Sequence, residues 1–182
     1  VFDESELRLL PKNYLNTIDN IFIWSGDSSV FPAIIKYIED KVNVERDTEK
    51  GDVRSIIVIE DTPRFYSSIL PILYKIIVYH TKQLIEKSLN DTQKLLHLRK
   101  RPKILLAQNY EEAIFYFNKY QNNLLGIVSD IRFPKSNKQD LKAGIKFSEY
   151  VQSKDEGIPI ILQTTDMSVS NNILHITDLL LN

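Results

Sequence analysis

Four consecutive β-branched residues at positions 56–59, preceded by Ser55 and followed by Glu60 and Asp61, restrict this chain more than any other feature. The run is too short for an ordinary helix, and its unbroken apolarity is typical of a strand buried on both faces of a parallel sheet. Open α/β sheets bind their ligands at the carboxyl ends of such strands. We therefore expect Glu60 and Asp61 to lie at a sheet edge where a ligand can bind.

Three further short apolar runs share this form, at residues 103–107, 124–128 and 158–162. The run at 124–128 leads into Asp130, and the run at 158–162 leads into Thr164. Because helix-like segments separate the runs, the chain has the order of an α/β domain with a doubly wound parallel sheet. The most uniformly apolar runs belong at its centre. The predicted strand order is 103–107, 55–60, 125–129, 159–163.

The segments between these runs carry apolar residues at helical spacing. Thr62 and Pro63 are typical of a helix start, and the apolar stripe after them continues to Ile77. Pro71 lies within this stripe, so we expect a kink or a later start of the regular helix, near Ser67. The apolar pattern continues weakly beyond Ile77, which predicts either one long helix or two helices broken near Asn90 and Asp91. The other predicted elements are helices at 109–120 and 143–151, a polar loop at 135–142, a helix near 169–176 and a strand near 179–181.

Residues 1–50 are predicted to form a separable strand-helix appendage. Residues 21–24 are a short β-rich run closed by a turn. The helix after them is indicated by apolar positions at the helical period, namely Phe31, Ile34, Ile35, Ile38 and Val42. Residues 43–54 are almost entirely polar around Gly51 and are predicted to be a solvated linker. The main domain is therefore expected to span residues 55–182.

The composition disfavours several kinds of partner. The 182 residues carry a net charge of −1, which gives no general attraction to nucleic acid or to anionic membranes. The basic cluster Arg99, Lys100 and Arg101 fits a solvated helix end better than a nucleic-acid contact, because no aromatic residue is interleaved. There is no cysteine, and no apolar run is long enough to span a membrane. We expect a cytoplasmic protein.

Other catalytic classes are also disfavoured. The sequence has no glycine pattern of a Walker or dinucleotide-binding site. His80, His97 and His175 are scattered, without the spacing of a hydrolase triad. The chain starts at Val1 rather than at Met, which indicates a piece of a longer protein. Whether that protein is an enzyme is left open by these residues.

The chemistry predicted at the sheet edge follows from the residues gathered there. Three carboxylates, those of Glu60, Asp61 and Asp130, repel one another unless a cation binds or their pKa values rise. Oxygen ligands without His or Cys suit Mg²⁺. A carboxylate beside bound Mg²⁺ can accept a phosphoryl group, and a nearby hydroxyl such as that of Thr164 can hold the oxygens of that group. The sequence therefore predicts a Mg²⁺-dependent phosphoryl-accepting site.

Five motifs carry a family resemblance, and they occur in the family's order. They are Val58-Ile59-Glu60-Asp61-Thr62-Pro63, Ala107-Gln108-Asn109-Tyr110-Glu111-Glu112-Ala113, Val128-Ser129-Asp130-Ile131-Arg132-Phe133-Pro134, Ala143-Gly144-Ile145-Lys146-Phe147 and Ile158-Pro159-Ile160-Ile161-Leu162-Gln163-Thr164. From residue 55 onward the chain thereby resembles the receiver domain of bacterial two-component response regulators, which has a flavodoxin-like fold.

The resemblance implies a role for each site residue. Glu60 and Asp61 would be the acidic pair that holds Mg²⁺, and Asp130 would be both a metal ligand and the phospho-acceptor. The backbone carbonyl of Arg132 would be the third metal ligand, and Thr164 would be the hydroxyl that closes on the phosphoryl group. The implied partners are a histidine kinase or phosphotransfer protein and a C-terminal output or enzyme domain. A homodimer is also compatible with the resemblance.

The chain departs from the family pattern at three places. The helical region between Asp61 and Lys103 is longer, Thr165 replaces a smaller residue, and the lysine of the fifth strand has no match before Asn182. Residues 1–50 resemble the end of a first, degenerate receiver-like unit. The whole also loosely resembles the receiver-like N-terminal region of bacterial phosphoenolpyruvate synthase-like and pyruvate phosphate dikinase-like proteins. The alternative function is thus a non-phosphorylated pseudo-receiver that regulates such an enzyme.

Overall fold

The computed structural model describes residues 18–88 and 90–164 of the chain. The predicted helix near 169–176, the predicted strand near 179–181 and Thr165 lie outside these residues. Among the described helices, none combines the length and the apolarity that crossing a bilayer demands.

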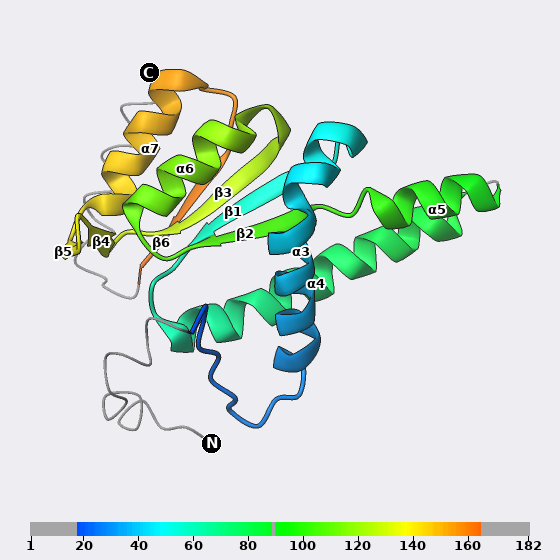
Figure 1. Cartoon of the computed structure of the whole chain (residues 1–182), viewed down its shortest axis with the longest axis horizontal. Coiled ribbons are helices and arrows are strands. Elements are labelled where there is room, and N and C mark those ends of the chain that lie inside the picture. The colour runs from blue at the N-terminus through cyan, green and yellow to red at the C-terminus, as the bar shows by residue number, and fades with distance from the viewer. Residues whose placement is uncertain (1–17, 89, 165–182) are drawn as a thin grey trace.

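Four parallel strands form the central sheet (Figure 1). They are β1 (Ser55–Ile59), β2 (Lys103–Ala107), β3 (Leu124–Asp130) and β6 (Ile160–Gln163). Their order in space is β2-β1-β3-β6, and each neighbouring pair is parallel. The predicted α/β class, the strand order and the central place of the β-branched run are confirmed. Uniformly apolar strands become central because both of their faces are then covered.

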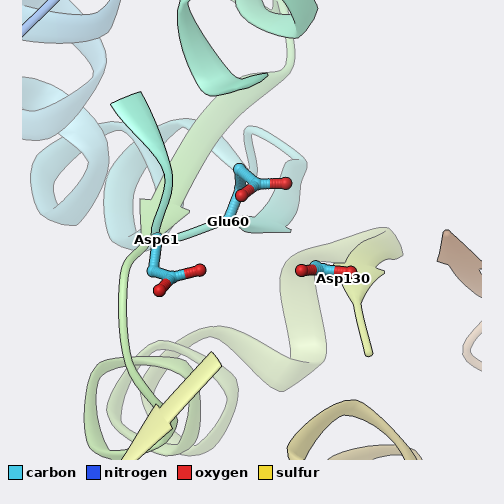
Figure 2. A group of neighbouring side chains, drawn as sticks. All are labelled: Glu60, Asp61 and Asp130. Atoms are coloured by element: carbon cyan, nitrogen blue, oxygen red, sulfur yellow. The ribbon is translucent and has the colours of Figure 1, made fainter. Parts of the chain in front are cut away.

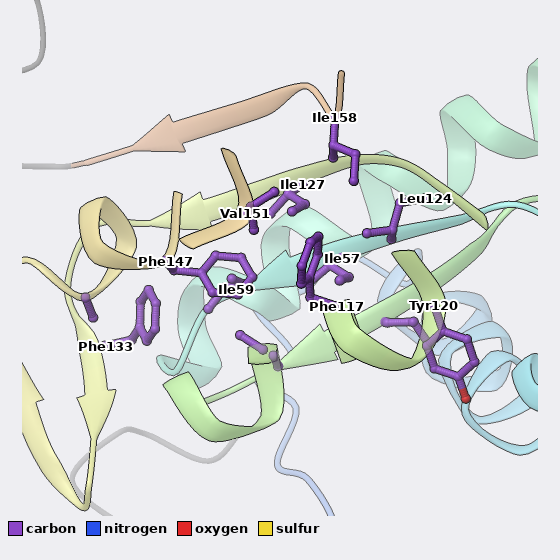
Figure 3. Close-up of a cluster of buried hydrophobic side chains, with 14 of the residues drawn as sticks. Ile57, Ile59, Phe117, Tyr120, Leu124, Ile127, Phe133, Phe147, Val151 and Ile158 are labelled. Atoms are coloured by element: carbon purple, nitrogen blue, oxygen red, sulfur yellow. The ribbon is translucent and has the colours of Figure 1, made fainter. Parts of the chain in front are cut away.

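One face of the sheet is covered by α6 (Tyr110–Tyr120) and α7 (Ala143–Lys154) (Figure 1). Asn109 begins α6 by accepting a hydrogen bond from the Glu112 amide at 2.8 Å, as a helix N-cap does. A short 3-10 turn, η1 (Gln121–Asn123), leads from α6 into β3. The core on this face consists of alternate strand residues and the inner sides of both helices, among them Ile57, Ile59, Phe117, Ile127, Phe133, Phe147 and Val151 (Figure 3).

The opposite face is covered by α4 (Pro63–Glu86), so the sheet has helices on both sides. This helix is continuous past Pro71 and begins at Pro63, as the Thr62-Pro63 signature predicts. The core here combines the other set of strand residues with α4, including Val58, Ile104, Leu106, Tyr66, Leu70, Tyr74 and Ile77. The predicted break near Asn90 is confirmed, because α5 (Asp91–Arg99) follows as a separate helix.

The N-terminal region differs from its prediction. Residues 21–24 are not a strand, and α3 (Val30–Gly51) includes most of the predicted linker. The apolar stripe that indicated this helix is largely exposed, and the buried side is instead formed by Val30, Ala33, Tyr37, Asp40, Val44 and Thr48. The predicted helix is confirmed, but its buried side includes the polar residues Asp40 and Thr48, which a hydrophobic pattern does not reveal.

Helix α3 lies against the outer edge of β2 and also packs on α4. The Lys103 amide donates to the Arg54 carbonyl at 2.9 Å on the inner side of β2, so the next amide, that of Ile104, points away from β1. Asp40 of α3 accepts this outward hydrogen bond at 2.9 Å. An open strand edge is a site for unwanted pairing, and α3 covers it. The structure thus has no packing boundary at residue 50.

The basic cluster also contains an unexpected residue. Arg101 is buried rather than solvated, and its Nη2 lies 2.6 Å from the Asp40 carboxylate. Tyr74 donates a hydrogen bond to the same carboxylate at 3.0 Å, and Lys103 Nζ lies 3.6 Å from it. The prediction of a solvated helix end is therefore wrong for Arg101, because a buried carboxylate from a distant helix pairs with it.

A small hairpin occupies most of the predicted polar loop. Strand β4 (Phe133–Lys135) pairs antiparallel with β5 (Lys138–Asp140). Ser136 and Asn137 connect them with φ values of 52° and 60°, the left-handed conformation that two-residue hairpin turns require. The residues are too polar and the strands too short for the alternation that normally predicts a hairpin.

Candidate functional site

Three carboxylates meet at the carboxyl edge of the sheet (Figure 2). Glu60 and Asp61 directly follow β1, and Asp130 is the last residue of β3, the neighbouring parallel strand. Each residue offers an oxygen atom within 4.8 Å of the others. In the close-up their carboxylates converge on one space between the two strand ends. The predicted gathering of these acids is therefore present in the structure.

Glu60 is the most enclosed member of the trio, with 2% of its surface exposed. Its Oε1 accepts a hydrogen bond from the Thr62 amide at 3.0 Å, and Gln163 Nε2 lies 3.5 Å from its Oε2. Burial raises the pKa of Glu60 to about 7, and the nearby charges of Asp130 and Asp61 act in the same direction. Glu60 is therefore poised to lose its charge or to share it with a cation.

The pKa values of the two aspartates are raised as well. Burial raises the pKa of Asp130, although hydrogen bonds from the Ile131 and Arg132 amides oppose the rise. The Ile131 amide donates to Asp130 Oδ1 at 2.7 Å. Burial and the charge of Asp130 also raise the pKa of Asp61. Burial raises the pKa of all three acids, and the charge of Asp130 further raises the pKa values of Glu60 and Asp61. Such an environment favours a positive ion.

The donor set fits Mg²⁺. All the side-chain ligands are carboxylate oxygens, which this hard cation prefers, and two or three of them leave room for its usual water ligands. Oxygens on opposite sides of Mg²⁺ are about 4.2 Å apart, since each lies about 2.1 Å from the ion. The observed spread of up to 4.8 Å is close to this value. Adjacent ligand oxygens of an octahedral ion are about 3.0 Å apart, so the three carboxylates would have to move closer together for shared coordination.

A pocket of about 180 Å³ opens beside the acids. Its lining is formed by Glu60, Phe65, Ile69, Asp130, Gln163 and Thr164. Thr164, predicted as the hydroxyl that holds a phosphoryl oxygen, thus shares a pocket with Asp130. Phe65 and Ile69 of α4 form an apolar wall of this pocket.

The predicted main-chain ligand, the carbonyl of Arg132, is engaged by the hairpin. Gln139 Nε2 of β5 donates a hydrogen bond to this oxygen at 3.1 Å. A carbonyl oxygen has a second lone pair, so the contact does not by itself exclude a metal. Gln139 was not predicted as part of the site, because the segment that carries it was expected to be a loop.

Gly144 at the start of α7 allows the helix to approach the end of β3. A Cβ atom at this position would lie 2.3 Å from the Asp130 carbonyl oxygen and 2.9 Å from the Ile131 Cα. The Gly144 amide donates to the Ile131 carbonyl at 3.0 Å. A side chain here would therefore displace the backbone that holds Asp130.

Two members of the pocket wall were missed by sequence reasoning. The sequence places Ile69 on the apolar stripe of its helix and predicts core or interface packing for Phe65, and nothing local indicates that either residue faces the acids. Gln163 could have been predicted, because it is a polar residue at the end of an apolar run.

A comparison of the chain with known protein families, with curated proteins and with solved structures found no match.

Proposed function

We propose that this chain is a regulatory module that accepts a phosphoryl group on Asp130 in a Mg²⁺-dependent reaction and signals to a larger protein. The observation that carries the proposal is the convergence of Glu60, Asp61 and Asp130 beside a pocket that also contains Thr164. Fold analogy with receiver domains agrees with this arrangement, but the argument rests on the site itself.

Asp130 is the best candidate for the acceptor. It lines the pocket together with Glu60, whereas Asp61 is not part of the lining. Glu60 is nearly inaccessible, and one of its oxygens is held by the Thr62 amide. In the proposed step, an Asp130 oxygen attacks phosphorus, a P–O bond to Asp130 forms, and the bond between phosphorus and the donor's leaving atom breaks.

The remaining residues hold and orient the reacting groups. Glu60 and Asp61 would bind Mg²⁺ together with Asp130, and the Arg132 carbonyl can contribute a further oxygen. Mg²⁺, when bound, would supply positive charge that stabilises the negative charge on the phosphoryl oxygens during transfer. The Thr164 hydroxyl would donate a hydrogen bond to one of those oxygens.

The test is treatment with acetyl phosphate and Mg²⁺, followed by measurement of the intact mass. We expect a gain of one phosphoryl group that chelation of Mg²⁺ prevents and Asp130→Asn abolishes. The matched control is Asp140→Asn, a change of the same chemistry in the adjacent hairpin, where Asp140 pairs with Lys146 at 2.6 Å. This control should still be modified. A mass gain that survives Asp130→Asn would show that another acid is the acceptor.

The proposed setting is the cytoplasm, where a histidine kinase or a phosphotransfer protein would be the natural donor. The proposed output is a further domain of the parent chain, either a signalling domain or a phosphotransferase. Both partners follow from the resemblance of the motifs, and either would act on the same sheet edge.

A second candidate function is a pseudo-receiver that is never phosphorylated and regulates a phosphoenolpyruvate synthase-like enzyme. The observation that favours it is that side chains of the protein itself already contact polar groups of the site. Gln139 occupies the Arg132 carbonyl, Gln163 lies beside Glu60, and the pKa of Glu60 near 7 allows that residue to be neutral. The absence of both a mass gain and any Mg²⁺ binding would favour this candidate.

A further inference from the structure

The outer side of α3 presents a row of apolar residues to solvent. Phe31, Ile35, Ile38 and Val42 are 50%, 59%, 53% and 73% exposed. Their spacing of four, three and four residues is that of the contact seam of a two-stranded coiled coil. Trp24, with 44% of its surface exposed, extends the row, since its ring lies 5.9 Å from that of Phe31. An apolar row of this length marks a contact surface.

We infer that this row, which we call the α3 seam, pairs with the α3 seam of a second copy of the chain in an antiparallel two-fold dimer. The buried side of α3 packs on β2 and α4 within one chain, and the seam lies on the other, exposed side of the helix. The inference is independent of phosphoryl transfer, because no seam residue belongs to the acidic site.

The order of side-chain sizes favours a second copy as the occupant. An antiparallel pair with its two-fold axis between Lys36 and Tyr37 places Phe31 opposite Val42 of the second copy, and Ile35 opposite Ile38 of the second copy. The bulkiest residue thus meets the smallest at both ends, which matches the volume of each layer. The same patch serves both subunits, as two-fold interfaces require.

The flanking charges favour the antiparallel orientation over the parallel one. In a parallel pair in register, Lys41 would lie beside Arg46 of the second copy at two symmetric places, and like charges would repel. In the antiparallel pair, Lys41 instead lies over Ile34 of the second copy, where its aliphatic stem can pack. In that arrangement its ammonium group keeps its contact with Asp19 of its own chain, at 3.2 Å.

The first experiment measures the mass in solution by light scattering and sedimentation over the micromolar range. We expect a dimer for the unmodified chain and roughly 30-fold weaker association for Ile35→Asp, because a charge would be buried at the centre of the seam. The matched control is Ile72→Asp on α4. Ile72 is also a helical isoleucine with 59% exposure, but it lies outside the seam. This variant should remain dimeric.

A second measurement reports on the seam directly. Trp24 is the only tryptophan, so its fluorescence arises from one end of the seam. Its emission should shift to shorter wavelength as the protein concentration rises, and Ile35→Asp should abolish the shift while Ile72→Asp preserves it.

The third experiment fixes the orientation through disulfides, which is possible because the chain has no cysteine of its own. Phe31→Cys/Val42→Cys should form a covalent dimer on oxidation, since the two positions oppose each other across the antiparallel pair. Neither single variant should do so, because each position lies about 16 Å along the axis from its own copy, beyond the reach of a disulfide. Efficient bridging by Val42→Cys alone would overturn the antiparallel orientation.

Two further outcomes would overturn the proposal. If the unmodified chain is a monomer throughout the concentration range, another part of the chain or a different partner covers the seam. If Ile72→Asp disrupts the dimer and Ile35→Asp does not, the contact lies on α4. Circular dichroism of each variant verifies that the fold is retained, so that a loss of association reports on the surface alone.

Discussion

Asp40 and Glu60 are both buried carboxylates, but their surroundings are opposite in charge. Asp40 receives hydrogen bonds from Arg101, Tyr74 and the Ile104 amide. Glu60 has two acids beside it, and burial raises its pKa to about 7. The first arrangement satisfies a charge within the protein, whereas the second leaves a charge that an external cation can satisfy. At the residue scale, this contrast separates a structural carboxylate from a candidate ligand.

The first stability prediction concerns Asp40. Asp40→Ala should lower the free energy of unfolding by about 3–5 kcal/mol, because Arg101 would remain buried without its carboxylate. The measurement is denaturation in urea. Asp19→Ala is the control, since the Asp19 side chain is 89% exposed although it too pairs with a lysine, and its loss should cost at most about 1 kcal/mol. Equal losses for both variants would contradict this account of the buried pair.

The second prediction concerns the pH dependence of stability in the absence of metal. The pKa of Glu60 is about 7 in the folded chain against 4.5 for the ordinary side chain, so the folded state binds its proton more tightly. Its contribution is fully present below about pH 4.5 and is lost as the pH rises through 7. The free energy of unfolding should thus fall by roughly 2–3 kcal/mol between about pH 5 and pH 8.

Urea titrations with a chelator present would measure this slope. Glu60→Gln should flatten it, because the amide cannot titrate, whereas Glu149→Gln at an exposed position of α7 should leave it unchanged. Asp61 and Asp130 act in the same direction as Glu60 because their pKa values are also raised, so some slope should remain. A stability that rises with pH over this range would show that the acids are not desolvated as described.

At the element scale, the approach of α7 to the end of β3 determines where Asp130 lies. Gly144 makes this contact possible through its missing side chain, and its amide binds the Ile131 carbonyl. Helix α7 therefore supports the backbone of Asp130, the candidate acceptor. Helix α3 has a comparable role at the opposite end of the sheet, where Asp40 holds the outward amide of β2.

Gly144→Ala should therefore affect both stability and the site. The added Cβ would overlap the Asp130 carbonyl oxygen at 2.3 Å, so we expect a loss of about 1–3 kcal/mol and slower modification of Asp130 by acetyl phosphate. Gly157→Ala is the control, because its Cβ would meet only the Asp155 carboxylate, at 3.2 Å, so that at most one exposed hydrogen bond, from the Gly157 amide to that carboxylate, is disturbed. If the Gly144→Ala protein is destabilised but Asp130 is modified at the normal rate, Gly144 contributes to packing and not to the position of Asp130.

At the scale of the whole molecule, α3 belongs to the core. Its residues contribute to the hydrophobic clusters on both faces of the sheet, Val44 to one and Ala33 and Tyr37 to the other. It also brings the carboxylates that pair with Arg101 and Lys103. The described parts of the chain thus form one packed unit in which the sheet depends on the helix at its edge.

A chain that starts at Val53 tests this dependence. We expect it to aggregate or to remain unfolded, because the edge of β2 would be open and the apolar side chains that pack against α3 would be exposed. Soluble yield and circular dichroism, compared with those of the full 182-residue chain, are the measurements. A monodisperse, folded product would instead support the separable appendage that the sequence predicts.

The sequence alone determined the class of the fold, the four strands, their order and the place where the acids meet. These features follow from local patterns. A short, unbroken β-branched run is typical of a central strand, and residues after parallel strands share one edge of the sheet. Glu60, Asp61 and Asp130 were therefore predictable as a group, although their roles stay predictions.

Only the tertiary structure decided which partners the distant residues have. Asp40 and Arg101 are 61 positions apart, and no local pattern links an acid on one helix to a cation beyond another. The same holds for the buried side of α3, since a helix with apolar residues on two sides has no single inward direction in its sequence. Gln139 reaches the Arg132 carbonyl only because a hairpin folds it back. Local preference acts over a few residues, whereas these contacts depend on where the chain returns in space.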